Sequence, residues 1–507
     1  MAGIGFSLKR LFSKKGIFNL CKAYGYAGII TTGPMLLGVI LLVCMSLLGR
    51  IAGLPGHQRE LLNCMLTYSL LVSLTVTSWF NMGSTRYIAD MLYEEKDEKI
   101  MPSFYGNVSI MLVICTVGYG IFLHFAGITF LQQLLCLWFA LVLIIVWTEM
   151  IYMTAIKDYK SIVLSYTISL LLGFLLAIVF VMLGYVRIET FLFSMIVSYG
   201  ILACRYHKLL LDYFPKAEGS NFSFLRWFDR YRKLVFAGGF VNIGLFSHLI
   251  IMYFGPLRVQ VQGLFYGAPQ YDVPAVFAFF SLLITTVNFV TSVEVEFYPK
   301  YSNYYGLFND RGSILDIEQA GKEMLDVLWQ QLTYASHKQV FTSVLFIVLG
   351  TPVLEALPLG MTALSFGVFR FLCVGYGSYA IANSCMLLLL YFEDYTGAAI
   401  GTFLFMSLST GCNIWQILYG NVNYFGMGFF AGAMAFYLFV VIRLNWYSKK
   451  LPYFLLSKQS IIPVSDHGPL AWIADRLDDL YEDRLAEKEE KAMKKAKLEA
   501  MKEGLIK

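Results

Sequence analysis

Long apolar stretches constrain this chain more than any other feature of its sequence. Roughly twelve of them, each about 20 residues or longer, follow one another between Tyr24 and Arg443. A bilayer core about 30 Å thick needs about 20 helical residues to cross it. A helix also satisfies its own backbone polar groups in lipid, where no water is available. The pattern predicts an all-α membrane protein with about 12 transmembrane helices.

Polar segments between the apolar stretches give the approximate ends of the expected spans. The spans lie near residues 24–48, 62–85, 104–126, 129–155, 161–185, 190–211, 234–254, 274–297, 338–356, 362–391, 396–419 and 423–444. The tenth is long enough to be tilted or broken, and eleven or thirteen spans are the alternatives. Composition agrees with a lipid environment, because 58% of the residues are hydrophobic and only 14% are charged. An ordinary soluble domain has about 25% charged residues.

Lysines and arginines are distributed unevenly between the two sides of the predicted membrane. On the side opposite the N-terminus, the loops carry only Arg50, Arg59, Arg187 and Arg258. The loops on the N-terminal side carry many more, among them Lys96, Lys99, Lys157, Lys160, Arg205, Lys208, Lys216, Arg226, Arg230, Arg232, Lys233, Lys300, Arg311, Lys322 and Lys338. Positively charged loops are retained in the cytoplasm. We therefore expect a multi-pass protein of the cytoplasmic (inner) membrane with both termini in the cytoplasm.

A charged segment near the middle of the chain divides the expected spans into two groups of six. The divisions that follow are a cytoplasmic amphipathic N-terminal segment at 1–23, an N-terminal six-helix lobe at 24–212, a cytoplasmic linker at 213–233, a C-terminal six-helix lobe at 234–445 with a cytoplasmic insert at 299–338, and a charged cytoplasmic tail at 446–507. Each lobe would bury its own helices and return the chain to the same side of the membrane.

Two short fragments recur at nearly the same offset across this division, and they suggest a duplicated six-helix unit. Small residues in the first helix of each half would let neighbouring helices pack closely. The matching positions are Gly28 with Gly239, Gly33 with Gly244, and Val76–Ser78 with Val290–Ser292.

Three polar segments within or after the second half have patterns of their own. The insert at 299–338 has apolar residues at helical spacing, which predicts one helix lying beneath the bundle. The outward loop at 255–273 is rich in aromatic and glutamine side chains, which would suit contact with sugars; a packed loop at the membrane interface is the alternative. The tail from Asp466 alternates acidic and basic residues around one apolar stripe, which predicts a surface helix.

Ionisable side chains within the spans are candidate functional residues, because charge in lipid is costly and usually faces a cavity. Arg86 and Asp90 are four residues apart at the end of the second span, so they can pair; bracing the helix end near the headgroups is the alternative. Glu294 and Glu296 are two residues apart and point in different directions on a helix. One of these two glutamates is expected to serve a site.

The other candidates lie at different depths in the predicted bundle. Glu149 is in the inner half of the fourth span, Asn288 is in the eighth, and Arg370 is in the outer half of the tenth. His248 in the seventh span is more simply explained as a hydrogen-bonded core residue. We expect Glu149, Asn288, Glu294, Glu296 and Arg370 to take part in substrate translocation.

Signatures of enzymes and of metal sites are not found in the sequence. It contains no Walker loop, GxSxG elbow, HExxH pair or clustered metal-ligand spacing. The nine cysteines form no CxxC pair and behave as small hydrophobes within the spans. The net charge of +5 is explained by basic membrane-protein loops. We therefore expect no enzymatic activity, no cofactor, no metal and no nucleic-acid partner.

Three parts of the sequence resemble the PelG family, the transporters of the Pel exopolysaccharide system of biofilms. They are Met1-Ala-Gly-Ile-Gly-Phe6, the stretch from Ala23-Tyr-Gly-Tyr-Ala-Gly28 to Gly33-Pro34, and Val293-Glu-Val-Glu-Phe-Tyr-Pro-Lys-Tyr301 followed by Tyr304-Tyr305. The last string is the most specific, and the resemblance covers most of the chain. It implies the fold of the flippase superfamily that contains Wzx and MurJ, with two six-helix lobes around a central cavity.

The resemblance also implies a function and partners. PelG-like proteins are thought to move a hexosamine-rich polysaccharide across the cytoplasmic membrane, beside a cytoplasmic glycosyltransferase (PelF-like) and membrane partners (PelD-like and PelE-like). An ion-coupled flippase or exporter of a lipid-linked sugar or small molecule is the alternative function, and a membrane-embedded transferase is a third. As a mechanism, we expect Glu149 and Glu294 to receive the chain at the cytoplasmic mouth, Asn288 to bond its hydroxyls and amides, and Arg370 to line the exit.

Overall fold

Membrane-spanning helices make up most of the chain, which confirms the all-α prediction. The computed structural model describes residues 28, 36–156, 158–309, 312–356, 360–457 and 468–502. Within them, 11 helices are long and apolar enough to cross a membrane, and the helix Leu36–Ile51 is apolar but shorter. This shorter helix belongs to the first expected span, 24–48, of which the structure describes only Gly28 and the residues from Leu36 onward. The N-terminal segment at 1–23 lies outside the described residues.

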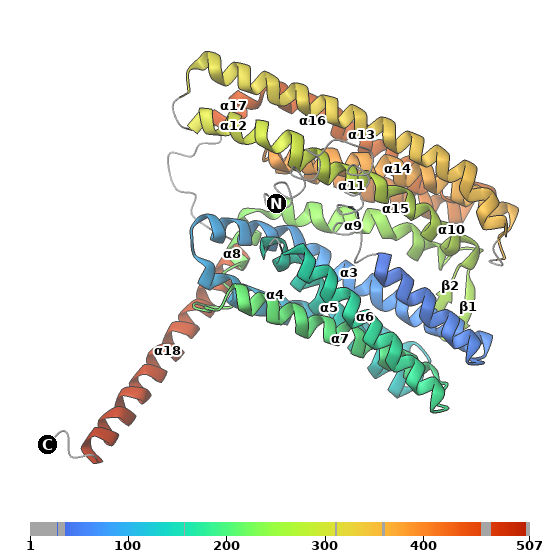
Figure 1. The fold of residues 1–507 in the computed structure, drawn as a ribbon, viewed down its shortest axis with the longest axis horizontal. Coiled ribbons are helices and arrows are strands. Elements are labelled where there is room, and N and C mark those ends of the chain that lie inside the picture. The colour runs from blue at the N-terminus through green and yellow to red at the C-terminus, as the bar shows by residue number, and fades with distance from the viewer. Residues whose placement is uncertain are drawn as a thin grey trace.

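The N-terminal lobe contains the helix Leu36–Ile51 and five longer helices that run side by side (Figure 1). These are α3 (Gly56–Tyr93), α4 (Ile100–Phe125), α5 (Phe130–Ile156), α6 (Tyr159–Met182) and α7 (Ile188–Tyr213), with the short 3₁₀ helix η1 (Asp97–Lys99) between α3 and α4. The lobe has its own hydrophobic core, in which Tyr87, Phe139 and Tyr199 are almost fully buried.

The C-terminal lobe lies beside the first and has a separate core around Phe405, Phe429 and Phe436 (Figure 1). Five of its six spans are single helices: α9 (Arg232–Met252), α13 (Ile314–Ala356), α14 (Ala363–Tyr391), α15 (Tyr395–Tyr419) and α16 (Met427–Lys449). The short helix η4 (Val422–Tyr424) precedes α16, and α17 (Leu451–Ser457) follows it. Its second span is a series of shorter helices: α10 (Pro269–Phe279), η2 (Phe280–Leu282), α11 (Leu283–Ser292), η3 (Val293–Phe297) and α12 (Tyr298–Asn309).

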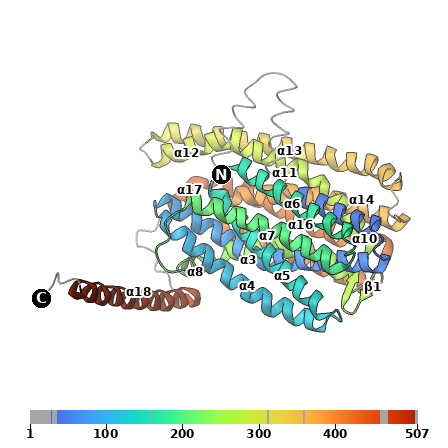
Figure 2. The ribbon, with the colours of Figure 1, turned by 60° about the horizontal axis from the view of Figure 1, so that its bottom comes forward.

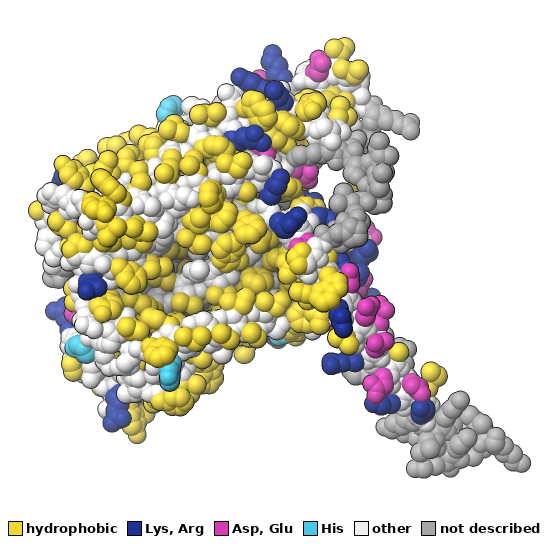
Figure 3. Space-filling view, turned by 180° about the vertical axis from the view of Figure 1, so that it is seen from behind, with side chains coloured by type: hydrophobic (Ala, Val, Ile, Leu, Met, Phe, Trp, Pro, Cys, Tyr) yellow, Lys and Arg dark blue, Asp and Glu magenta, His cyan; other side chains and the backbone are white. Residues whose placement is uncertain are grey.

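The two ends of the bundle differ in charge. Hydrophobic side chains cover its sides, whereas most lysines and arginines in view gather at the end from which the C-terminal helix projects (Figure 3). We call this the basic end; α3 and α7 finish there, and α9 begins there. The opposite end carries a short β-hairpin and is called the hairpin end. The bands of apolar and basic side chains are those of a multi-pass membrane protein.

The segment at 299–338 differs from the expected helix beneath the bundle. Its residues form α12 and the first half of α13, and α13 continues without interruption through the ninth span to Ala356. The sequence from 322 to 349 contains no glycine or proline, so nothing stops the helix between the polar segment and the apolar one. α12 and α13 therefore lie side by side as continuations of spans eight and nine (Figures 1 and 2).

The outward loop forms a β-hairpin that packs against both lobes. Strand β1 (Val259–Gln262) pairs with β2 (Phe265–Gly267) in antiparallel register. The Leu264 N–H donates to the Ala126 carbonyl at 3.1 Å, and the Tyr68 hydroxyl donates to the Tyr266 carbonyl at 3.0 Å. Ala126 and Tyr68 belong to the N-terminal lobe, so the hairpin joins the lobes at this end. Of the two expectations for the loop, packing is the one that the contacts support.

The linker and the tail are joined by ion pairs at the basic end. The linker contains α8 (Leu225–Arg230), and the tail contains α18 (Pro469–Lys502). Arg226 contacts the carboxylates of Asp475 and Asp478 at 2.6 and 2.7 Å. Burial lowers the pKa of Arg226, but the hydrogen bonds to these carboxylates outweigh it and leave the pKa above its usual value. Beyond this anchor, α18 projects away from the bundle (Figures 1 and 2).

Glycines on α9 allow the two lobes to approach each other, as the expected packing of small residues predicts. A Cβ added at Gly239 would lie 2.5 Å from the ring of Trp79 on α3, and one added at Gly238 would lie 2.8 Å from the Ser78 carbonyl oxygen. Within the C-terminal lobe, a Cβ at Gly244 would lie 2.5 Å from Phe405. Gly33, the counterpart of Gly244 in the first half, lies outside the described residues.

The substitution Gly239→Ala should destabilise the contact between the lobes. The Trp79 ring must move to accept the methyl group, and overpacking of this kind costs about 1–3 kcal/mol. Thermal unfolding of the purified protein in detergent should show a lower midpoint. The matched control is Gly118→Ala on α4, where an added Cβ meets nothing within 4 Å; equal midpoints for the two variants would contradict the close contact.

Candidate functional site

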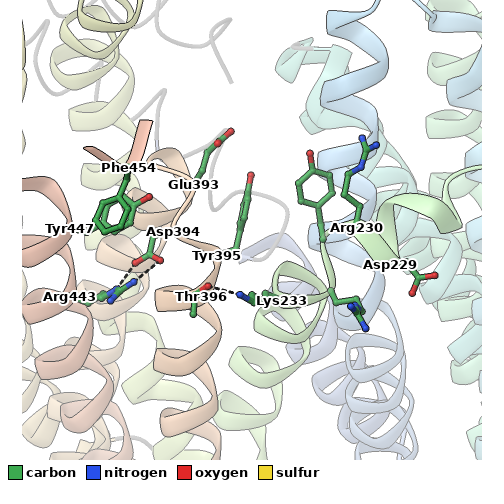
Figure 4. A pocket seen from close by; sticks show the side chains of 12 residues that line it. Asp229, Arg230, Lys233, Glu393, Asp394, Tyr395, Thr396, Arg443, Tyr447 and Phe454 are labelled. Carbon is green, nitrogen blue, oxygen red and sulfur yellow. Dashed lines mark hydrogen bonds and ion pairs between the residues drawn. The ribbon is translucent and has the colours of Figure 1, made fainter. Parts of the chain in front are cut away.

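A cavity of about 420 Å³ opens at the basic end, where the linker meets the C-terminal lobe. Figure 4 shows side chains around it from α8, α9, the turn between α14 and α15, the start of α15, α16 and α17. The lining residues are Asp229, Arg230, Tyr231, Arg232, Lys233, Glu393, Asp394, Tyr395, Thr396, Arg443, Tyr447 and Phe454. The lining combines charges of both signs with aromatic rings, a set that suits a polar ligand with flat or hydroxylated faces.

An ion pair with a buried carboxylate holds the side of the cavity that is formed by α16 and the turn between α14 and α15. Arg443 on α16 contacts both carboxylate oxygens of Asp394, at 2.6 and 3.0 Å (Figure 4). The Asp394 side chain is only 4% exposed, and it also accepts the Gly397 N–H at 3.0 Å, which caps the start of α15. The guanidinium lies over the Trp446 ring at 4.6 Å. One carboxylate therefore fixes the positions of two helices.

A hydrogen bond and two aromatic pairs complete the lining of the cavity. The Lys233 ammonium on α9 donates to the Thr396 hydroxyl at 2.8 Å (Figure 4). The Tyr231 and Tyr395 rings meet edge to face with centroids 5.6 Å apart, and the Tyr447 and Phe454 rings stack at 4.3 Å. Aromatic faces and nearby donors could contact a sugar through its apolar face and its hydroxyl groups.

The predicted pair Arg86 and Asp90 is present and extends to the second lobe. Arg86 Nε lies 3.1 Å from Asp90 Oδ1, and Arg86 Nη1 lies 3.8 Å from Glu393 Oε1 in the turn that lines the cavity. The guanidinium also lies 5.0 Å from the Tyr231 ring centroid. The Trp227 indole N–H donates to Asp90 at 2.8 Å. The pair therefore links α3, α8 and the α14–α15 turn, and does more than brace one helix end.

The eighth span, which contains the most specific family string, is the most irregular one. Pro274 lies inside α10, η2 is a 3₁₀ segment, and η3 (Val293–Phe297) is a π-helix. π-Helical segments occur frequently at functional sites, and interrupted spans form many transporter sites. Glu296 lies in this π-helix and is exposed, and Glu294 lies there too, but its side chain is outside the described residues. The two glutamates stay predictions as site residues.

Asn288 lies in α11, one helical segment before the π-helix. Its neighbour is Lys338, which the sequence interpretation placed in a loop. The Lys338 ammonium on α13 donates to Asn288 Oδ1 at 2.9 Å and lies 4.1 Å from the Tyr334 ring centroid. The next residue, Gln339, bonds the Thr285 hydroxyl and the Ser281 carbonyl. These contacts form a polar network between α11 and α13. The unbroken helical pattern through 314–356 was the signal that could have placed Lys338 on a spanning helix.

Glu149 and Arg370 do not lie at the cavity. Glu149 is 1% exposed within the N-terminal lobe, and its Oε1 atom lies 3.9 Å from His207 Nδ1 on α7. Its side chain is absent from the lining of the cavity described, and its role in receiving substrate stays a prediction. Arg370 is exposed on the first third of α14, near the hairpin end. Burial inside one lobe cannot be seen from the position of a residue along a span.

His248 is a core residue, as expected. It is fully buried, and its two ring nitrogens lie 2.8 Å from the Tyr271 hydroxyl and 3.2 Å from the Tyr376 hydroxyl.

The sequence interpretation missed the cavity residues Arg232, Lys233 and Arg443, because it used charges at span ends only to assign orientation.

The substitution Arg443→Met should destabilise the protein, because it leaves the Asp394 carboxylate buried without a counter-charge. Breaking a fully buried pair costs about 3–5 kcal/mol, and because the Arg443 side chain is 28% exposed we expect roughly 2–3 kcal/mol. Thermal unfolding in detergent measures the effect. The control Lys96→Met removes the exposed pair with Glu94 and should change the free energy of unfolding by less than about 0.5 kcal/mol. A similar change in the free energy of unfolding for both variants would contradict a stabilising role for the Arg443–Asp394 ion pair.

The fold of this chain is similar to those of several solved membrane transporters. The chain is similar to an outward-facing multidrug resistance MATE family transporter of the MOP superfamily (TM-score 0.55, 11% identity, 89% of this chain and 99% of that one). It is also similar to the MATE transporter VcmN of Vibrio cholerae (0.55, 13%, 86% and 98%) and to a MOP superfamily transporter from Pyrococcus furiosus (0.52, 12%, 84% and 96%). At these identities the likeness shows the fold, two lobes of membrane helices.

Sequence comparison identifies the family. No curated protein matches the chain. The family profile described as "PelG: Putative exopolysaccharide Exporter (EPS-E)" matches residues 1–455, which include both lobes and the cavity lining and end before α18. The family is one of exopolysaccharide exporters by its description, and the fold is similar to that of membrane transporters. The resemblance noted in the sequence is thereby confirmed, and this chain belongs to the PelG family.

Proposed function

We propose that this protein exports a hexosamine-containing exopolysaccharide of the Pel type across the cytoplasmic membrane. The observation that carries the proposal is the family match over residues 1–455, on a chain with a transporter fold and a charged, aromatic cavity at one end. In this proposal the basic end faces the cytoplasm, because positively charged segments are retained there. The polymer enters at the cavity as it leaves a PelF-like glycosyltransferase, with PelD-like and PelE-like membrane proteins as further partners.

The cavity offers the contacts that a sugar chain requires. Tyr231 and Tyr395 provide rings for its apolar faces, while Arg232 and Lys233 provide donors for its oxygens. Arg86 and Glu393 lie 3.8 Å apart across the lobes, and in the proposed cycle this contact opens and closes the entrance. Deeper in the membrane, the π-helix with Glu294 and Glu296 and the Lys338–Asn288 pair form the next polar groups along the C-terminal lobe.

Export of a lipid-linked sugar or small molecule, driven by ions, is the second candidate. The fold shared with multidrug transporters favours it. The products distinguish the two functions: loss of a polysaccharide exporter removes secreted polymer, whereas loss of a small-molecule exporter leaves polymer unchanged and alters drug tolerance or lipid-linked intermediates.

The orientation predicts the location of the C-terminus. A green fluorescent protein fused after residue 507 should fluoresce and an alkaline phosphatase fused there should be inactive, because the positively charged end stays in the cytoplasm. The same two reporters inserted at the hairpin turn between Gln262 and Phe265 should give the opposite result. Active phosphatase at the C-terminus would place the basic end outside the cytoplasm and contradict the proposed orientation.

The substitution Glu294→Gln should reduce export. In a strain deleted for the gene, the wild-type chain should restore secreted hexosamine polymer, and the variant should restore at least about fivefold less, the effect of losing roughly 1 kcal/mol of interaction. The control Glu487→Gln removes an exposed α18 carboxylate paired with Lys491 and should export normally. Membrane levels of each variant are compared by immunoblot. Normal secretion by the Glu294 variant removes this residue from the site, and normal secretion after gene deletion refutes the function.

A further inference from the structure

A carboxyl group lies unpaired in the core of the N-terminal lobe. The Glu149 side chain on α5 is 1% exposed, and among the described residues its Oε2 atom has no hydrogen-bond partner. Its Oε1 atom lies 3.9 Å from His207 Nδ1 on α7, which is longer than a hydrogen bond. The mechanism proposed above does not use this group, because it lies outside the cavity lining.

The groups that face Glu149 leave it without a counter-charge. Within the described chain, no lysine or arginine forms an ion pair with it. From α7, Tyr206 donates to the Ile162 carbonyl at 3.3 Å. On α5 itself, Tyr152 bonds Ser103 and Asn107 of α4 at 2.9 and 2.8 Å. A lone carboxylate in such surroundings is costly, and the neutral acid avoids that cost.

A second titratable group connects this carboxyl group to the surface. The His207 side chain is 33% exposed, and its Nε2 atom lies 3.3 Å from the hydroxyl of Tyr105 on α4. Tyr105 is itself exposed. Glu149 and His207 lie about 10 Å from the ends of α5 and α7 at the basic end, given a rise of 1.5 Å per residue. Histidine exchanges protons readily near neutral pH.

We propose that Glu149 is a proton-binding site of the N-terminal lobe, loaded and unloaded from the basic end through His207. A proton from bulk water joins Nε2 of the neutral imidazole, which carries its own proton on Nδ1, and forms the imidazolium. The proton arrives directly or through the Tyr105 hydroxyl, which takes up a proton from water as it passes its own to Nε2. The proton on Nδ1 then passes to Glu149 Oε1 after the two atoms approach by about 1 Å. His207 ends neutral with its proton on Nε2, and Glu149 ends as an uncharged acid. Each cycle changes the charge buried in this lobe by one unit.

Infrared spectroscopy of the full-length protein in nanodiscs tests the proposal directly. Near neutral pH, the wild-type protein should show a protonated carboxyl C=O band that shifts in D₂O, and Glu149→Gln should remove it. The control Glu189→Gln, whose carboxylate accepts the Gln132 amide at the hairpin end, should retain the band. His207→Phe should retain the band but slow its hydrogen–deuterium exchange at least tenfold. A wild-type band that survives Glu149→Gln overturns the site, and unchanged exchange in His207→Phe overturns the route.

Stability gives an independent readout that does not depend on export. Glutamine has the shape of the neutral acid, so Glu149→Gln should unfold at the same temperature as the wild-type protein or higher near neutral pH. A clearly lower midpoint would mean that the charged carboxylate is the native form, contrary to the proposal. Because neither readout uses the polymer, they stand even if the proposed substrate is wrong.

Discussion

In lipid, each backbone N–H and C=O must find its partner within the same helix, and this requirement organises the whole chain. It explains why 11 long apolar helices account for most of the described residues, and why the irregular segments of the eighth span lie within the bundle and not as free loops in the membrane. Once the helices form, association between them depends on close packing. Glycines such as Gly239 against Trp79 provide it where the two lobes meet.

The sequence was sufficient for the features that depend on one helix at a time. Hydropathy predicted the spans, and the four-residue spacing of Arg86 and Asp90 predicted their ion pair. It was insufficient where partners come from distant parts of the chain. Lys338 was assigned to a loop because a charge ends an apolar window, although the same helix continues through it to Ala356. The surroundings of Glu149 could not be predicted either, because depth along a span does not reveal which neighbours surround a side chain.

The candidate site also depends on contacts between distant parts of the chain. Asp394 and Arg443 are 49 residues apart and lie at the ends of different spans, so no local pattern joins them. Their ion pair fixes the turn that presents Glu393 to Arg86 and Tyr395 to Tyr231. The cavity is therefore lined by the C-terminal lobe and the linker, and Arg86 of the first lobe contacts two of its lining residues, Glu393 and Tyr231. Charges of the kind that set the orientation of a membrane protein also line the cavity here.

The β-hairpin has a consequence for how well the membrane is sealed. Four hydrogen-bonded pairs tie it to the first lobe: Leu264 with Ala126, Tyr68 with Tyr266, Gln262 with the Gly127 carbonyl at 3.1 Å, and His57 with the Val261 carbonyl at 2.7 Å. At about 1 kcal/mol each, separating the lobes there costs roughly 4 kcal/mol, so the parted state holds under about 1% of molecules. The hairpin would thus act as a clasp that keeps the two lobes closed at this end of the bundle, and any path for water or ions between the lobes would first have to break it.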